Sequence, residues 1–169
     1  MAVIEGHLSS AGRRFGVVAA LTNDLVVSRL LEGALDALRR TGAADADVVV
    51  ARTPGAWELP LALRDLGRQG GFDALVALGA VLRGGTPHFE YVAGEAARGV
   101  FQVSLELDIP VTFGVLTCDT LEQALERSGA KGGNKGFEAG LAAIEMAQLS
   151  RKLRATEEKS APVGKLRRK

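Results

Sequence analysis

Residues 74–90 read ALVALGAVLRGGTPHFE, a mostly apolar run that breaks into a glycine-rich polar loop. The apolar part is too short to span a membrane and is typical of a parallel strand that is covered on both faces. The loop after it carries a cation, a hydroxyl and an imidazole, on Arg83, Thr86 and His88. Because ligands of open α/β sheets bind beyond the carboxyl ends of such strands, this loop predicts a site for a phosphorylated substrate that needs proton transfer.

Similar apolar runs occur elsewhere in the chain, and amphipathic stretches separate them. The pattern predicts further strands at residues 15–21, 47–51 and 111–116, and helices at about 25–41, 57–69, 91–107, 121–127 and 135–153. Strands that alternate with helices form parallel sheets with right-handed crossovers. We therefore expect a three-layer α/β/α sandwich around a central four-stranded parallel sheet.

Length and composition indicate a single domain. The chain has 169 residues, of which 47% are hydrophobic, and this is enough for one sizeable core. No apolar run approaches the roughly 20 residues of a spanning helix, and the N-terminus lacks a signal-peptide pattern, so we expect a cytoplasmic protein. Cys118 is the only cysteine, and nothing in the sequence supports a nucleophilic or metal-binding role for it.

Charge is divided between the body of the chain and its tail. Residues 1–150 hold 13 Lys+Arg and 18 Asp+Glu, whereas residues 151–169 hold 8 and 2. We expect an N-terminal extension over 1–13, a domain over 14–153, and a basic, disordered tail over 154–169. The tail is either a solubilising extension or a segment that binds an anionic partner, such as RNA or an acidic neighbouring surface.

Candidate functional residues follow the predicted strands. They lie at residues 22–23, 54–58, 83–88 and 113–117. Because parallel strands point their carboxyl ends the same way, we expect these segments to share a pocket. His88 lies in a polar loop and either transfers protons near neutral pH or is an exposed or capping histidine.

Glu58 and Trp57 each allow two interpretations, whereas Asn134 and Lys135 are each predicted to have one role. Glu58 either interacts with a helix dipole or hydrogen-bonds to a bound heterocycle, and Trp57 either fills the core or lends its ring to a ligand. The sequence GGNKG at 132–136 follows no strand and does not fit a P-loop, so Asn134 is predicted as a helix N-cap and Lys135 as a cation near an anion site. Nothing in the sequence calls for a metal or a nucleotide cofactor.

Five segments, taken together, resemble the 6,7-dimethyl-8-ribityllumazine synthases: PGAWELP at 54–60, GAVLRGGTPHFE at 79–90, PVTFGVLT at 110–117, LEQALERSG at 121–129 and GNKG at 133–136. The resemblance implies a flavodoxin-like fold and a transferase without a cofactor. Such an enzyme condenses 5-amino-6-(D-ribitylamino)uracil with 3,4-dihydroxy-2-butanone 4-phosphate in the penultimate step of riboflavin biosynthesis. The rival interpretation is a catalytically weak flavin- or lumazine-binding shell protein of the same fold.

The resemblance also implies a role for each candidate residue. The pyrimidine would be bound by Thr22, Asn23, Ala56, Trp57, Glu58, Ala80, Val81, Leu82, Phe113 and Lys135. The phosphate of the second substrate would be bound by Gly85, Thr86 and Arg127, whose guanidinium supplies a fork of donors. His88 would relay protons, and Arg83 would be a structural or interface residue.

The family resemblance implies a homopentamer with active sites between adjacent subunits, and in some members a 60-subunit icosahedral shell. Residues 113–117 and Arg127 would then complete a site across the interface, and residues 2–9 could add an edge strand to a neighbouring subunit. Association with riboflavin synthase is expected on the same ground. No membrane contact is expected, and nucleic acid is expected only through the basic tail.

Thr22 is the one clear departure from the family pattern, which often has an aromatic residue there that stacks on the pyrimidine. Replacing Thr22 by Phe or Trp should restore stacking and tighten binding of the pyrimidine by about fivefold, or ~1 kcal/mol. Titration of the variant with the pyrimidine or a product analogue measures this change. An unchanged dissociation constant would refute the stacking argument.

Overall fold

The computed structural model describes residue 1 and residues 3–160, with side chains up to residue 156. Four strands, β1 (Phe15–Ala20), β2 (Val48–Thr53), β3 (Ala74–Leu82) and β4 (Val111–Cys118), form a sheet in the order β2-β1-β3-β4. Every neighbouring pair in this sheet is parallel. Short 3-10 helices, η1 (Asp45–Asp47) and η2 (Ala56–Glu58), flank β2.

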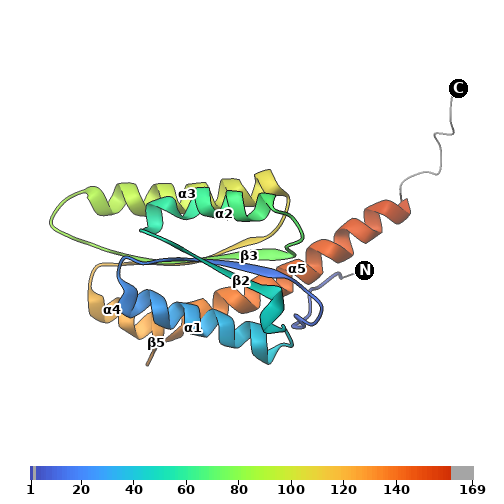
Figure 1. Cartoon of the computed structure of the whole chain (residues 1–169), viewed down its shortest axis with the longest axis horizontal. Coiled ribbons are helices and arrows are strands. Elements are labelled where there is room, and N and C mark those ends of the chain that lie inside the picture. The colour runs from blue at the N-terminus through green and yellow to red at the C-terminus, as the bar shows by residue number, and fades with distance from the viewer. Residues whose placement is uncertain (2, 161–169) are drawn as a thin grey trace, which may run out of the picture.

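Helices cover both faces of the sheet (Figure 1). On one face lie α2 (Leu59–Arg68) and α3 (His88–Leu107), and on the other lie α1 (Asp24–Arg40), α4 (Leu121–Arg127) and α5 (Lys135–Ser160). This arrangement confirms the predicted three-layer sandwich. Among the described residues, no helix has the length and hydropathy needed to cross a bilayer.

The two central strands are apolar because both of their faces are buried. All six residues of β1 are buried, and in β3 only Leu82 is partly exposed. Val17 and Leu78 pack toward α1 and α5, whereas Val18 and Leu75 pack toward α2 and α3. Each fully buried side chain of this size contributes about 1.5–3 kcal/mol through removal of apolar area from water.

Two helix boundaries differ clearly from the prediction. The helix predicted from residue 91 begins at His88, because Pro87 holds a φ of −63° immediately before it and favours helix initiation. The helix predicted to end near residue 153 continues to Ser160, so residues 154–160 are helical and not part of a disordered tail. These residues are mostly good helix formers, which apolar periodicity alone does not detect. Residues 161–169 of the expected tail lie outside the described residues.

A short hairpin between α4 and α5 was not predicted from the sequence. It consists of β5 (Ser128–Ala130) and β6 (Gly133–Asn134), which pair antiparallel. Gly129 and Gly133 have φ values of 117° and 81°, which side chains rarely tolerate. These two glycines therefore allow the chain to reverse direction tightly between α4 and α5.

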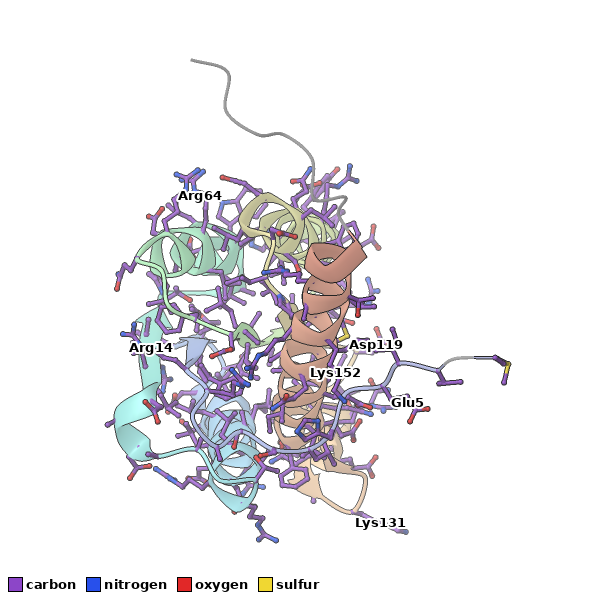
Figure 2. The ribbon with its side chains drawn as sticks, turned by 90° about the vertical axis from the view of Figure 1, so that its right-hand side faces the viewer. Glu5, Arg14, Arg64, Asp119, Lys131 and Lys152 are labelled. Carbon is purple, nitrogen blue, oxygen red and sulfur yellow. The ribbon has the colours of Figure 1, made fainter. Side chains whose placement is uncertain are left out.

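The N-terminal segment packs against helix α5 of its own chain. Lys152 Nζ donates to the Glu5 carbonyl at 2.8 Å, and Gln148 Nε2 donates to the Ser9 carbonyl at 2.7 Å. Figure 2 shows Glu5 and Lys152 where this segment crosses the helix. Residues 3–9 form no strand in the single chain, so the expected edge strand would require a neighbouring subunit.

Helices α1 and α5 approach each other closely at glycines. A Cβ on Gly136 would overlap the backbone carbonyl of Leu30, and a Cβ on Gly33 would overlap the Asn134 side chain. These two contacts bring the hairpin and the start of α5 against α1. The position of Arg127 and Lys135, on either side of the hairpin, therefore depends on this glycine contact.

Replacing Gly136 by Ala should force α1 and α5 apart and lower the free energy of unfolding by about 1–3 kcal/mol. For a chain of this size, the midpoint of thermal unfolding should fall by roughly 3–10 °C. Gly84→Ala is the matched control, because a Cβ there would meet nothing within 4 Å. Equal midpoints for the two variants would contradict the steric argument.

Candidate functional site

A cavity of about 440 Å³ opens where β1, β2 and β3 end. We call it the first hollow. Its lining comes from the three segments that follow these strands: Thr22, Asn23, Pro54, Gly55, Ala56, Trp57, Glu58, Ala80, Val81, Leu82, Gly84, Thr86, His88, Phe89 and Val92. Its volume is within the usual range for a small-molecule site. Three of the four segments expected at this edge are therefore brought together.

Asn23 and Thr22, just after β1, hydrogen-bond to the neighbouring strand ends at the base of the first hollow. Asn23 has a left-handed backbone conformation, with φ 61° and ψ 41°, and its Nδ2 donates to the Ala80 carbonyl at 2.7 Å. The hydroxyl of Thr22 donates to the Pro54 carbonyl at 2.8 Å, and the Thr22 amide donates to the same oxygen at 3.0 Å. These bonds connect the ends of all three strands.

The backbone of β3 is left open toward this hollow. The pairing of β1 with β3 ends at Leu78, whereas the pairing of β4 with β3 continues to Leu82. On the side away from β4, residues 80–82 therefore extend beyond their strand neighbour. Asn23 uses the Ala80 carbonyl, and the remaining backbone groups on that side can bind the polar edge of a ligand.

The turn at 54–58 holds Glu58 and displays Trp57. One carboxylate oxygen of Glu58 accepts a hydrogen bond from the Gly55 amide at 2.9 Å, and the other has no partner among the described residues. Glu58 therefore caps η2 with one oxygen and leaves the second available. Trp57 is 56% exposed, so the interpretation of its ring as core filler is wrong. Trp57 is the middle residue of η2 and lies on the cavity wall, outside both hydrophobic core clusters.

The loop before α3 carries His88 and has little packing of its own. His88 is the exposed first residue of α3 and makes no hydrogen bond to any described residue. A Cβ on Gly84 or Gly85 would meet nothing within 4 Å, and neither glycine has a left-handed φ. The fold itself therefore does not require glycine here, and the bare backbone is left accessible to a ligand.

Arg83 is bound to protein groups and does not line the hollow. Its Nε donates to Asp119 Oδ1 at 2.7 Å, its other contact is to Glu90 Oε1 at 3.2 Å, and its guanidinium lies 4.2 Å from the centre of the Phe89 ring. The hydrogen bond to Asp119 is the main cause of a raised pKa for the Arg83 guanidinium.

A second hollow of about 540 Å³ lies beside the edge strand β4. It is lined by Thr112, Phe113, Gly114, Val115, Leu116, Thr117, Cys118, Arg127, Lys135, Glu138, Ala139 and Ala142, none of which lines the first hollow. The expectation that all four segments share one pocket is therefore wrong for a single chain. Residues 113–117 lie in the edge strand β4, and they line the hollow next to α4 and α5.

The second hollow supplies the cations that the first hollow lacks. Arg127 is exposed and makes no hydrogen bond or ion pair with any described residue, whereas Lys135 Nζ lies 2.5 Å from Glu138 Oε2. Burial raises the pKa of the Cys118 thiol, and the nearby Arg127 charge opposes this only in part. A neutral, buried thiol is a poor nucleophile, as expected from the sequence.

Asn134 caps α5, as predicted. Its Oδ1 accepts from the Gly136 and Phe137 amides at 2.8 and 3.1 Å. Within the described part of the chain, no cluster of three or more His, Cys, Asp or Glu side chains could hold a metal ion. The groups that the two hollows offer to a ligand are the His88 imidazole, the Glu58 carboxylate, the rings of Trp57 and Phe113, and the Arg127 guanidinium.

Sequence reasoning missed several lining residues. Phe89 and Val92 line the first hollow because α3 begins at His88 and places them on its inner side. Glu138 lines the second hollow, and its spacing of three from Lys135 on a helix was the available signal.

Comparison with known proteins finds one family. The family model described as 6,7-dimethyl-8-ribityllumazine synthase matches residues 12–151. Proteins of that name are similar over most of the chain. The protein from Anaeromyxobacter sp. (strain Fw109-5) is 59% identical, over 89% of this chain and 93% of its own length. The protein from Desulfatibacillum aliphaticivorans is 55% identical, over 88% and 96%, and that from Aquifex aeolicus (strain VF5) is 51% identical, over 91% and 100%.

The role of Asn23 can be divided by two substitutions. Asn23→Gly keeps the left-handed backbone and loses the bond to Ala80, so the free energy of unfolding should fall by about 1 kcal/mol. Asn23→Ala loses the bond and adds backbone strain, so the loss should be about 2 kcal/mol. Denaturant unfolding curves measure both losses. If the glycine variant were as unstable as the alanine variant, backbone conformation would contribute nothing at this position.

Proposed function

The chain belongs to the 6,7-dimethyl-8-ribityllumazine synthase family, and from this membership we propose that it uses its two hollows to condense 5-amino-6-(D-ribitylamino)uracil with 3,4-dihydroxy-2-butanone 4-phosphate. The products are 6,7-dimethyl-8-ribityllumazine, phosphate and water. The reaction is the penultimate step of riboflavin biosynthesis and requires no cofactor.

One observation carries the assignment of a shared site. The first hollow contains the histidine and the open strand edge, but its lining among the described residues includes no Lys or Arg. The second hollow contains Arg127 without an ion-pair partner. A phosphorylated substrate needs both sets of groups, so we assign each active site to the first hollow of one subunit and the second hollow of its neighbour.

The pyrimidine binds in the first hollow. The free backbone groups of residues 80–82 and the unbonded oxygen of Glu58 face a ligand with donors and acceptors along its edge. Thr22 presents no ring, and its hydroxyl is already bonded to Pro54. The exposed ring of Trp57 supplies aromatic surface on the same wall, and Phe113 supplies a second ring from the neighbouring subunit.

The phosphate of the second substrate binds between the loop 84–86 and Arg127. Gly84 and Gly85 leave the backbone accessible, and the Thr86 hydroxyl lines the hollow. The guanidinium of Arg127 gives a bidentate partner for the anion, with Lys135 as an additional cation.

Asn23 and the backbone of Ala56 also belong to the pyrimidine site. Asn23 contributes indirectly, because its side chain fixes the position of the Ala80 carbonyl.

His88 moves the protons. The 5-amino group attacks the substrate ketone, and loss of water gives a Schiff base. Loss of a proton from C3 then expels phosphate from C4, and the resulting enol tautomerises to a ketone at C3. Attack of the ribitylamino nitrogen on this new carbonyl closes the ring with loss of a second water. Each step transfers a proton near the first hollow, which an imidazole accepts and donates near neutral pH. Holding two substrates together provides much of the acceleration.

The outer face of α3 supports assembly of several copies. Tyr91, Phe101 and Leu105 are 65–70% exposed on this helix, and Gly94 leaves open space beside them. Exposed apolar faces of this kind mark contacts between proteins. The shared site and this face support the proposal that the copies form a homopentamer. The proposal extends to an icosahedral shell and to association with riboflavin synthase. The enzyme works in the cytoplasm.

Replacing His88 by Ala should lower kcat by roughly 10- to 1000-fold, as expected for loss of a proton relay, and should leave assembly intact. Steady-state assays with both substrates measure the rate, and light scattering with size-exclusion chromatography measures the assembly. Arg127→Ala should mainly raise KM for the phosphorylated substrate. An unchanged kcat for the histidine variant would refute its assigned role.

Mixing the two variants tests the shared site. Co-expressed His88→Ala and Arg127→Ala chains form some sites with both intact halves, and random mixing should restore about a quarter of the wild-type rate. Separately purified and unmixed variants are the control. If co-expression restored no activity, both halves of each site would come from one chain.

A further inference from the structure

Arg83 connects three segments that meet beside the first hollow. Arg83 directly follows β3. Its Nε donates to Asp119, just after β4, and its guanidinium also donates to Glu90 in the first turn of α3. Its guanidinium also covers the Phe89 ring, which lines the hollow. The backbone amide of Arg83 donates to the Cys118 carbonyl at 2.9 Å, so the connection begins in the sheet itself.

The segment next to Arg83 has little else to hold it. Residues 83–88 are all exposed, and a Cβ on Gly84 or Gly85 would meet nothing within 4 Å. His88 itself has no hydrogen-bond partner among the described residues. The position of its imidazole therefore depends on the first turn of α3, whose next two residues are the ones that Arg83 contacts.

The geometry of the Arg83 contacts differs from that of an ordinary surface ion pair. A single exposed pair contributes little to stability, because water and salt screen it and two side chains lose freedom. Here one planar guanidinium bridges two carboxylates on separate segments and also stacks on a ring. A lysine ammonium is a point charge without a planar fork and cannot reproduce this arrangement.

We propose that Arg83 is a positioning residue for His88, which it holds in place by clamping the first turn of α3 to the end of β4. This inference rests on the proposed role of His88 in proton transfer. It also explains why an arginine stands in the loop although its side chain does not line either hollow.

Substitution of Arg83 should slow turnover without weakening pyrimidine binding. Arg83→Met should lower kcat by roughly 5- to 50-fold, since small displacements of a catalytic group have effects of this size, and should change KM for the pyrimidine by less than about twofold. Arg68→Met is the matched control. Arg68 is also exposed and paired with one carboxylate, Glu106, at 2.5 Å, and it lies near the opposite end of α3. Its kcat should stay within about twofold of the wild type.

Arg83→Lys separates positioning from direct electrostatic action. It keeps the positive charge but loses the fork, so its kcat should be nearly as low as that of Arg83→Met. Recovery of the wild-type rate with lysine would mean that only the charge matters, and would overturn the proposal. Asp119→Asn, which removes a partner of the clamp with little change in shape, should lower kcat in the same direction.

A double-mutant cycle shows whether Arg83 acts through His88. In the His88→Ala background, Arg83→Met should change kcat by less than about twofold, because no imidazole remains to be positioned. Independent, multiplicative losses would overturn the proposal while leaving the role of His88 intact. If His88→Ala alone left kcat unchanged, the proposed role of His88 as a proton relay would be refuted. The comparison of the Arg83 and Arg68 variants would still show whether Arg83 affects turnover.

Discussion

Strand β3 extends further on one side than on the other, and the candidate site depends on this asymmetry. Its pairing with β1 ends at Leu78, and its pairing with β4 continues to Leu82. Residues 80–82, at the end of β3, therefore have backbone groups that no strand pairs with on the side of β1 and β2. Asn23 uses one of these groups to fix the floor, and the others remain open to a ligand.

The burial of β3 makes this arrangement rigid. Because the strand is apolar on both faces, it needs a helical layer on each side, and both layers are present. A strand that is hydrogen-bonded to a neighbour on each edge and packed on both faces cannot shift without breaking ladder hydrogen bonds and close side-chain packing. The packed strand end contrasts with the loop that follows it, where a Cβ on Gly84 or Gly85 would meet nothing within 4 Å. The proposed function uses both parts, since the strand end would hold one substrate and the accessible loop backbone would bind the other.

The chemistry is divided between two edges of the sheet. The imidazole and carboxylate lie at the ends of β1 to β3, and the free guanidinium lies beside β4, next to α4 and α5. Close contact at Gly33 and Gly136 sets where α5 begins and so where Lys135 lies. In the proposed active site the two hollows come from adjacent copies, which would make assembly a condition of activity, and the exposed apolar face of α3 supports such contacts.

Much of the fold could be predicted because it depends on local patterns. Continuous apolar runs identified all four strands of the main sheet, and Asn134 was identified as a cap from its position before a helix. The start of α3 differs from the prediction because Pro87 fixes a helical φ just before His88, an effect that apolar spacing does not show. The sequence left Trp57 undecided, because an aromatic residue at a helix start suits the core and a cavity wall equally well, and the structure exposes its ring.

Local patterns in the sequence specify the succession of strands and helices along the chain, the apolar character of the sheet and the candidate groups at the strand ends. Which of these groups meet depends on tertiary packing. The edge position of β4 separates Phe113 from Trp57, and the Arg83 contacts join residues far apart in the chain. The order of strands across the sheet, the edge position of β4 and the side-chain contacts arise from packing between distant segments. Local residue patterns do not encode this packing.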